Sequence, residues 1–333
     1  MAECFLEVNG KRIAASPGET LTDAALAGRI VIPQDCGSGQ CGTCRVKVLS
    51  GSVDAQGTES RGTVLACRAR LTGSAAIAFD LVPDRQRIDG VVTAITMLGP
   101  HTAEIRVETS RRLVWLAGQY VKLTFKGFPP RDLSPTFPAD LSVRDDMLTF
   151  HMMVQPDGRV SSQLGSGIQP GHRIGITGPF GSAFLRRGNG RLIFASTGSG
   201  FAPIFALAVS ARLGQPWRDV VLVAGARHAQ DLYMRRACDA LVEKGAKVVL
   251  TASDGDGSDI ATLRPQLLLP PLLPTDVVHA AGAPSLVKAV ERLAEAADAE
   301  FHSDSFTAAP AEAPGLGARL KGLFGRAAGR TSS

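Results

Sequence analysis

Three of the six cysteines in this 333-residue chain stand in one short, glycine-rich segment, QDCGSGQCGTC. Cys36, Cys41 and Cys44 follow the spacing C-x4-C-x2-C, and Cys67 stands alone further along the chain in VLACRAR. A segment of glycine, serine and threonine offers little to a hydrophobic core, so the thiols need a different explanation. Their spacing matches the ligand pattern of a plant-type [2Fe-2S] cluster, and we predict these four cysteines as its metal ligands.

The glycines beside the cysteines suit this chemistry. Two irons and two bridging sulfides need thiolates that converge from one side and backbone N–H groups that point at the sulfurs. The chain can wrap so closely only where few side chains intervene. Gly37, Gly39 and Gly42 also tolerate dihedral angles that a bulkier residue resists.

Other uses of cysteine explain the pattern less well. A structural zinc site usually brings two short hooks, whereas this chain has a single C-x2-C pair. A redox C-x2-C motif would leave Cys36 and Cys67 without a role, and a disulfide framework conflicts with a cytosolic chain. The remaining cysteines, Cys4 and Cys238, fit packing positions better than ligand positions.

Charge and hydropathy indicate a cytoplasmic protein without a membrane span. The first residues carry an acid and no apolar run, unlike a signal peptide. Residues 192–211 are uncharged and long enough to span, but their middle, STGSGFAP, is typical of a turn between a strand and a helix. LLLPPLLP (267–274) is too short to span and is broken by prolines. The net charge of +5 is too small to indicate nucleic-acid binding.

The segments DCGSGQCGTCRVKVLSG and VLACRARLTG together resemble the plant-type ferredoxin domain of bacterial oxygenase reductases. The resemblance implies a small β-grasp domain, which we expect over residues 1–82, followed by a polar linker over residues 83–90. Within the domain, the NG pair of CFLEVNGKR predicts a tight hairpin turn. The segment ETLTDAALAGRI predicts a short helix with Thr20 or Thr22 as its N-cap.

Strand-forming segments follow the linker. GVVTAITMLG, TAEIRVET, GQYVKLTF and MLTFHMMV show period-two alternation and are separated by glycine and proline, as in a β-barrel. GQYVKLTF, RDLS, GRVS and GPFG resemble the flavin-binding domain of the ferredoxin–NADP reductase superfamily. The resemblance implies an FAD-binding β-barrel over residues 91–187. It implies FAD contacts for Arg131, Leu133, Ser134, His151, Met153, Gly158, Val160 and Ser161.

The residue types at these positions agree with that implication. Arg131 can pair with a phosphate, and Ser134 can hydrogen-bond near the reactive nitrogen of the flavin. Gly158 and Ser161 can offer donors to the pyrophosphate. Leu133 departs from the family, which usually has a tyrosine there, because leucine has neither a π-face nor a hydroxyl group.

From residue 188 onward, strands and helices alternate. RLIFAST, DVVLVAGA, AKVVLTAS and DVVHAAGA predict buried strands with helices between them, so we expect a doubly wound parallel sheet over residues 188–306. TGSGFAP resembles the nicotinamide-nucleotide motif of the same superfamily, and GARHAQDLY resembles its segment for the adenosine half. The resemblance implies NAD(P) contacts for Gly198, Ser199, Gly200, Pro203, Gly225, Arg227, Asp231 and Gly282.

Chemistry again supports the nucleotide assignment. Gly198 and Gly200 let the backbone approach a pyrophosphate at the N-terminus of a helix, and Pro203 suits the first helical turn. Arg227 is the residue to suspect for a 2′-phosphate, although one arginine does not decide between the two nucleotides, and the family comparison favours NADH over NADPH.

Two further positions come from the same resemblance. AAGAPSLVKAV is similar to a Cys-Gly-Pro-type motif near the nicotinamide, with Ala281 in place of the cysteine, and we expect hydride transfer between the two cofactors to survive this change. Phe306, in FHSDSF, is a candidate to lie beside the flavin, and an ordinary core aromatic explains it nearly as well.

Two segments carry no site in this interpretation. Residues 307–333 predict a disordered tail, with a weak basic amphipathic helix that docks on a partner or an anionic surface as the alternative. SDGDGSD (253–259) resembles a calcium loop only superficially, because Arg264 occupies the position where such a loop needs glutamate.

Together the three parts form a route for electrons. A nicotinamide gives up two electrons at once and a [2Fe-2S] cluster takes one at a time, so a flavin must stand between them. We predict an NAD(P)H-dependent iron–sulfur flavoprotein reductase without catalytic acid–base residues. It most resembles the reductase components of bacterial aromatic-ring-hydroxylating dioxygenases, whose acceptor is a terminal oxygenase or a separate ferredoxin. The alternatives are the reductase of a soluble diiron monooxygenase or deoxysugar dehydratase system and a non-catalytic iron–sulfur redox sensor.

Overall fold

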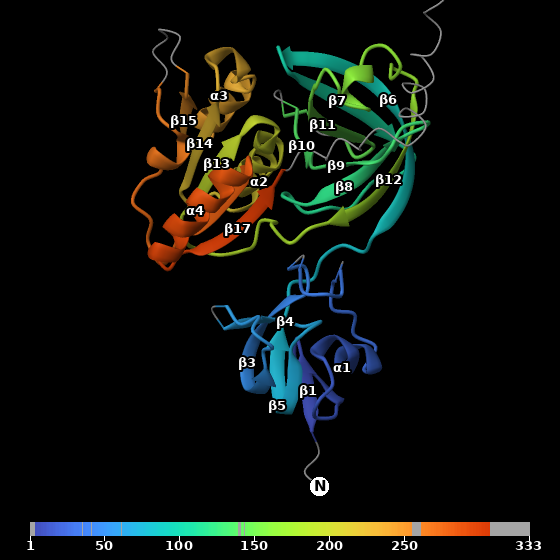
Figure 1. The fold of residues 1–333 in the computed structure, drawn as a ribbon, viewed down its shortest axis with the longest axis vertical. Helices are drawn as coiled ribbons and strands as arrows, with labels where there is room; N and C mark the ends of the chain where they lie inside the picture. The colour runs from blue at the N-terminus through green and yellow to red at the C-terminus, as the bar shows by residue number, and fades with distance from the viewer. Residues whose placement is uncertain are drawn as a thin grey trace, which may run out of the picture.

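The strands of the protein form three sheets that follow one another along the chain (Figure 1). The first sheet (blue in Figure 1) lies below, and the other two lie side by side above it. The computed structural model describes residues 4–34, 36–40, 42–60, 62–138, 141–142, 144–254 and 261–306. Cys41, most of the SDGDGSD loop and the tail from residue 307 lie outside the described residues, so what we expect of them stays a prediction.

The first sheet has the strand order β2-β1-β5-β3-β4, with β1 antiparallel to β2 and parallel to β5. A helix packs on it through Leu21 and Ala25, which share a buried cluster with Leu6 and Ile77. This mixed sheet with one helix confirms the expected β-grasp fold. Its elements are β1 (Phe5–Val8), β2 (Lys11–Ala14), α1 (Leu21–Ala27), β3 (Arg45–Asp54), β4 (Thr63–Leu65) and β5 (Arg70–Ala78).

Local sequence signals are confirmed in this unit. Asn9 and Gly10 take φ values of 49° and 84° between β1 and β2, as a two-residue hairpin turn requires. Thr20 is the N-cap of α1, because its hydroxyl accepts a hydrogen bond of 3.1 Å from the Asp23 N–H. The other candidate, Thr22, lies inside the helix.

The second sheet is antiparallel throughout, with the order β10-β11-β7-β6-β12-β8-β9, and it curls into a half-barrel (Figure 1). Ile105, Phe125 and Phe150 are fully buried inside it. The expected flavin-domain barrel is therefore confirmed. Its strands are β6 (Gln86–Gly99), β7 (Thr102–Thr109), β8 (Tyr120–Phe125), β9 (Arg131–Leu133), β10 (Pro135–Thr136), β11 (Met147–Met153) and β12 (Arg173–Phe180).

The linker is shorter than predicted. Residues 86–90 were expected in it because they are polar, but they begin β6 and pair with β12, from Gln86 opposite Gly178 to Gly90 opposite Ile174. Ile88 supplies the reason, since its side chain is buried in the barrel core. Only the residues between the end of β5 and the start of β6 are left as a connection.

The third sheet is parallel throughout, with the order β15-β14-β13-β16-β17. The chain starts in the middle, extends to one edge and then crosses to the other, which is the doubly wound topology that we predicted. Its elements are β13 (Leu192–Thr197), α2 (Phe201–Gly214), β14 (Val220–Ala226), α3 (Arg235–Glu243), β15 (Lys247–Ala252), β16 (Val277–Gly282), α4 (Pro284–Ala296) and β17 (Glu300–Ser305).

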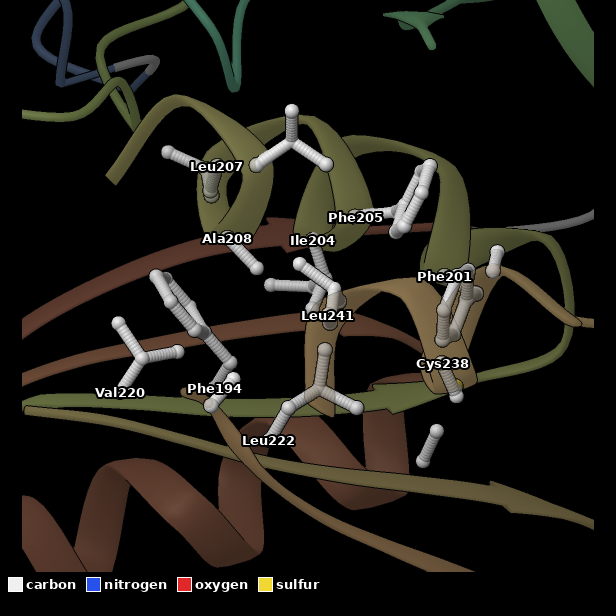
Figure 2. Packing of buried hydrophobic residues seen from close by; sticks show 14 of the residues in the cluster. Phe194, Phe201, Ile204, Phe205, Leu207, Ala208, Val220, Leu222, Cys238 and Leu241 are labelled. Carbon is white, nitrogen blue, oxygen red and sulfur yellow. The ribbon is translucent and has the colours of Figure 1, made fainter. Parts of the chain in front are cut away.

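Helices cover both faces of this sheet. On one face, Phe194 and Leu222 lie under Phe205 of α2 and Leu241 of α3 (Figure 2). The opposite face packs against α4 in a separate buried cluster that includes Val290. Two apolar faces explain why the strands are hydrophobic without alternation.

Two predictions about this part of the chain can be checked directly. Residues 192–211 divide into β13, a 3-10 turn (Gly198–Gly200) and α2, as expected, and no helix in the described ranges is long and apolar enough to cross a membrane. The helix expected between DVVLVAGA and AKVVLTAS is present as α3. It begins at Arg235, after a separate 3-10 turn (Ala229–Asp231).

Candidate functional site

The cysteine segment and Cys67 bring sulfur atoms together without a disulfide between Cys44 and Cys67. The sulfurs of Cys44 and Cys67 lie 3.2 Å apart, which is too far for a disulfide, and Cys44 is buried. Cys36 lies on the exposed side of the same loop, where its sulfur accepts a hydrogen bond of 3.4 Å from the Ser38 N–H. The fourth predicted ligand, Cys41, is outside the described residues.

Glycine makes this loop possible. Gly37, Gly39 and Gly42 have φ values of 62°, 83° and 74°, in the left-handed region that other residues rarely adopt. Sulfurs that lie close together and a backbone N–H directed at one of them are what an iron–sulfur cluster requires of its loop. The described residues therefore fit a [2Fe-2S] cluster bound by cysteine thiolates.

The RDLS segment lies at the edge of the half-barrel, on β9. Arg131 is partly buried, and its guanidinium donates a hydrogen bond of 3.0 Å to the neighbouring Pro130 carbonyl. Leu133 packs against the barrel core. Ser134 is buried, and its hydroxyl lies 3.5 Å from a carboxylate oxygen of Asp304 on β17. The flavin candidate Ser134 therefore faces the third sheet.

Asp304 is a site residue that we did not predict from the sequence. Burial raises its pKa to about 6, the negative charge of Asp132 acts in the same direction, and the hydrogen bond from Ser134 opposes both. A carboxyl group that gains a proton near neutral pH beside a flavin candidate is a functional-site signal. The only sequence signal was an acid in the alternating segment FHSDSF, which does not reveal a partner so distant in the chain.

The GRVS turn places its three predicted FAD contacts, Gly158, Val160 and Ser161, in different surroundings. A Cβ atom on Gly158 would lie 2.2 Å from the Ser161 hydroxyl oxygen, so a larger residue would displace the Ser161 side chain. That hydroxyl already accepts a hydrogen bond of 3.1 Å from the Gln155 N–H. Val160 is fully buried in the barrel core. The buried Val160 side chain leaves only its backbone for a pyrophosphate, and the predicted FAD contacts of Gly158 and Ser161 stay predictions.

Strand β11 brings the half-barrel against the third sheet. A Cβ atom on Gly198 would lie 2.9 Å from the terminal methyl of Met153. His151 is buried, its ring lies edge-on to Tyr233 with centroids 5.6 Å apart, and its Nδ1 has no hydrogen-bond partner in the described chain. Burial alone would raise the pKa of Glu104, the cross-strand neighbour of His151, but Arg106 at 2.7 Å and His151 at 3.9 Å outweigh burial and lower it.

A cleft opens beside these residues. It has a volume of about 690 Å³, and its wall includes Leu98, Glu104 and His151 from the half-barrel and Gln230 and Tyr233 from the third unit. Of the predicted FAD contacts, only His151 lines it. The unpartnered His151 nitrogen and this open space fit a polar group of a bound cofactor.

The predicted nucleotide turn is closely packed at the carboxyl ends of β13 and β16. A Cβ atom on Gly200 would lie 2.5 Å from the Ala281 carbonyl, and one on Gly282, which has a φ of 119°, would lie 2.4 Å from the Thr197 carbonyl oxygen. The Thr197 hydroxyl accepts a hydrogen bond of 3.0 Å from the Ala283 N–H. In a parallel sheet, ligands bind at these strand ends.

The structure brings together some of the predicted nucleotide residues. Gly198, Gly225 and Asp231 line one small pocket of about 20 Å³. Asp231 is also bound to His101 of the half-barrel, at 2.9 Å, so it joins the two units. Arg227 lies exposed directly after β14, where a phosphate can reach it.

The other predicted positions lie around the same turn. Ser199 lies within it, and Pro203 is buried in the first turn of α2. Phe306 follows β17, where its N–H donates a hydrogen bond of 2.9 Å to the Gly282 carbonyl. Phe306 is thus held at the edge where the third sheet meets the half-barrel, two residues beyond Asp304.

Comparison with known proteins agrees with this geometry. Residues 6–72 match the family model of the 2Fe-2S iron-sulfur cluster binding domain. The reductase subunit of an aromatic O-demethylase from Amycolatopsis is 32% identical over 249 residues, covering 68% of this chain and 73% of that protein. The reductase component of a naphthalene 1,2-dioxygenase system from Pseudomonas putida is also 32% identical, covering 69% of this chain and 73% of its own.

Solved structures match most of the length of this chain. The crystal structure of a cytochrome P450 reductase from Amycolatopsis has a TM-score of 0.65 at 27% identity, covering 92% of this chain and 99% of its own. The ferredoxin reductase in carbazole 1,9a-dioxygenase has a TM-score of 0.63 and covers 92% of this chain and 98% of its own. At 23% identity, this second match supports the fold alone.

Fold and site therefore define an iron–sulfur flavoprotein oxidoreductase. The chain belongs to the family of ferredoxin–NAD(P)+ reductase components of oxygenase systems. The resemblance noted in the sequence is confirmed, as are the cofactors it implied: a [2Fe-2S] cluster, FAD and a nicotinamide nucleotide.

Proposed function

We propose that this protein takes electrons from NADH and delivers them one at a time, through FAD and its iron–sulfur cluster, to a terminal oxygenase or to a separate ferredoxin. The observation that carries the proposal is the meeting of β9 and β11 with the carboxyl edge of the third sheet, at Ser134–Asp304 and at Met153–Gly198. The residues predicted to contact the flavin and the nicotinamide nucleotide thus lie at one boundary, between the half-barrel and the third sheet, as direct hydride transfer needs.

Where the half-barrel meets the third sheet, different residues of this chain are assigned to different parts of FAD. FAD, when bound, accepts two electrons together and releases them singly, which matches a two-electron donor to a one-electron cluster. Arg131 and the backbone of the GRVS turn are the candidates to hold its phosphates, and Ser134 to orient its ring. Asp304 holds or releases a proton near neutral pH beside that hydroxyl.

On the nucleotide side, the glycine turn at Gly198 and Gly200 lets a pyrophosphate approach the N-terminus of α2. We assign Arg227 to the adenosine half, and we propose NADH in preference to NADPH. The proposed domains are residues 1–82, 86–187, with the start moved to the first residue of β6, and 188–306. A cytoplasmic location is part of the proposal and agrees with the assignment of the cysteines as cluster ligands, since the cytosol keeps thiols reduced and disulfides rare.

Anaerobic stopped-flow mixing with NADH tests the proposal. We expect the flavin absorbance to bleach first and the cluster to become reduced afterwards, with a rhombic S = 1/2 signal in frozen samples. The same experiment with NADPH serves as the nucleotide control and should be slower. A purified protein without colour would refute the assignment. A flavin that NADH does not bleach would also refute it, and would favour a non-catalytic sensor.

A further inference from the structure

The connection between the first sheet and the half-barrel is fastened where it begins. The Asn9 side chain accepts a hydrogen bond of 2.9 Å from the Phe79 N–H and donates one of 3.1 Å to the Phe79 carbonyl. Because Asn9 belongs to the β1–β2 turn, the segment that leaves β5 has a fixed starting direction.

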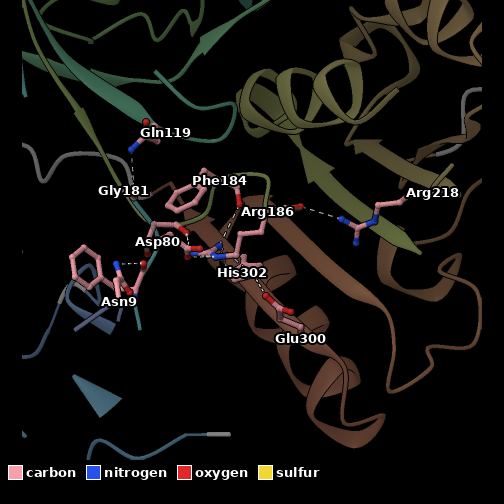
Figure 3. Close-up of polar contacts among 11 residues, drawn as sticks. Asn9, Asp80, Gln119, Gly181, Phe184, Arg186, Arg218, Glu300 and His302 are labelled. Carbon is pink, nitrogen blue, oxygen red and sulfur yellow. Dashed lines mark hydrogen bonds and ion pairs between the residues drawn. The ribbon is translucent and has the colours of Figure 1, made fainter. Parts of the chain in front are cut away.

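Next along the connection, Asp80 binds Arg186, which precedes the third sheet. The Arg186 Nε donates a hydrogen bond of 2.6 Å to the Asp80 carboxylate (Figure 3). The other guanidinium nitrogens donate to the Phe184 carbonyl at 3.3 Å and the Ser182 carbonyl at 3.1 Å, and the Phe184 ring lies 4.2 Å below. Arg186 is therefore held in place by its own segment, so less side-chain entropy is lost when it binds Asp80.

Arg186 also connects Asp80 with the last strand of the third sheet. One guanidinium nitrogen lies 3.4 Å from both ring nitrogens of His302, and His302 is paired with Glu300 at 2.7 Å. Successive side chains of a strand alternate between its faces, so Glu300, His302 and Asp304 share one face of β17. Strand β17 therefore makes two contacts. Through Asp304 it contacts the flavin candidate Ser134, and through His302 it contacts Arg186, which binds Asp80 in the connection to the first sheet.

The connection ends on a second arginine, which reaches the cysteine segment. Arg85 donates a hydrogen bond of 2.7 Å to the Gln34 carbonyl, two residues before Cys36. Its guanidinium also lies 5.0 Å from the centre of the Phe180 ring, in the last barrel strand, and that ring packs on Tyr120 at 5.5 Å. Arg85 thus touches the segment that leads to the cluster ligands and the barrel wall at once.

We propose that Asp80 and Arg85, within the connection of residues 79–85, form a clasp and act as positioning residues for electron transfer. The clasp holds the cysteine segment against the half-barrel, so that each of the two electrons delivered by one hydride can pass from the flavin to the cluster in a separate single-electron step. Units joined by a short connection move relative to one another unless an interface holds them, and misplacement of reacting groups lowers the rate steeply. The inference rests on the proposed function.

A matched pair of variants tests the clasp in the holoenzyme. Asp80→Arg places a positive charge against Arg186, whereas Asp84→Arg makes the same change of charge four residues away. Asp84 is exposed and makes no ion pair in the described part of the chain. Asp80→Glu keeps the charge and serves as the conservative rescue. The measurements are stopped-flow reduction by NADH and hydrogen exchange of the backbone amides of residues 79–85.

We expect Asp80→Arg to slow cluster reduction at least about tenfold while flavin reduction by NADH stays within about twofold of the unmodified protein. Hydrogen exchange of the clasp amides should rise in this variant, and Asp80→Glu and Asp84→Arg should match the unmodified protein in both measurements. Unchanged exchange and cluster reduction in Asp80→Arg would overturn the clasp, and so would an equal loss in Asp84→Arg. If NADH failed to reduce the flavin of the unmodified protein, the proposed function would fall, while the exchange comparison would still decide whether the clasp exists.

Discussion

Asp304 shows how one partly buried side chain can set a pH dependence. Its pKa is raised to about 6 because burial and Asp132 disfavour the charged form. The folded protein therefore holds this proton more tightly than the unfolded chain does, and the stabilisation is complete below the ordinary aspartate pKa. It is lost as the pH rises through about 6.

The variant Asp304→Asn should remove this dependence. At pH 8 the unmodified protein carries a partly buried charge that the variant lacks, so we expect a higher thermal midpoint for the variant. At pH 4 both side chains are neutral and the midpoints should converge. Asp84→Asn, at an exposed position, should give no such divergence. Thermal unfolding at the two pH values measures the effect, and a constant difference between them would contradict it.

Ser161 shows what a motif leaves open at the residue scale. The GRVS motif predicts a turn, and in the structure a Cβ atom at Gly158 would lie 2.2 Å from the Ser161 hydroxyl oxygen. It could not show that the serine hydroxyl is engaged by the Gln155 backbone, because that bond depends on how the turn closes. A side chain that a motif predicts as a donor to a ligand can equally bind its own loop.

At the scale of elements, local signals predicted structure well. The hairpin at Asn9, the cap at Thr20 and the hydrophobic strands of the third sheet all follow from short-range chemistry. The start of β6 could not be predicted in this way, because Ile88 alone signals burial in an otherwise polar segment. The contact of Asp304 with Ser134 also could not be predicted, since it joins two different sheets.

The meeting of β13 and β16 supports a prediction about Gly282. The position combines a φ of 119° with a Cβ site 2.4 Å from the Thr197 carbonyl oxygen. We expect Gly282→Ala to lower the free energy of unfolding by roughly 1–3 kcal/mol and to weaken NADH binding, since the strand ends must separate. Gly175→Ala in β12 is the control, because no atom lies within 4 Å of its Cβ site. Equal effects of the two variants on the thermal midpoint and on NADH affinity would count against this explanation.

At the scale of the whole molecule, each sheet has its own buried cluster of side chains. Loss of one cofactor should therefore leave the others in place. We expect Cys67→Ala to abolish the signal of the reduced cluster while NADH still bleaches the flavin. Cys4→Ser, a change outside the ligand pattern, should keep both signals. A cluster retained in the Cys67 variant, or lost in the Cys4 variant, would show that the ligand set is wrong.

The shortness of the connection between β5 and β6 has a consequence for how the acceptor is met. Only seven residues, 79–85, separate the two strands. Fully extended, such a segment reaches about 25 Å. Even after release from Arg186, the iron–sulfur unit could not travel far across the surface. The acceptor protein must therefore approach the unit near its present location, within reach of the half-barrel.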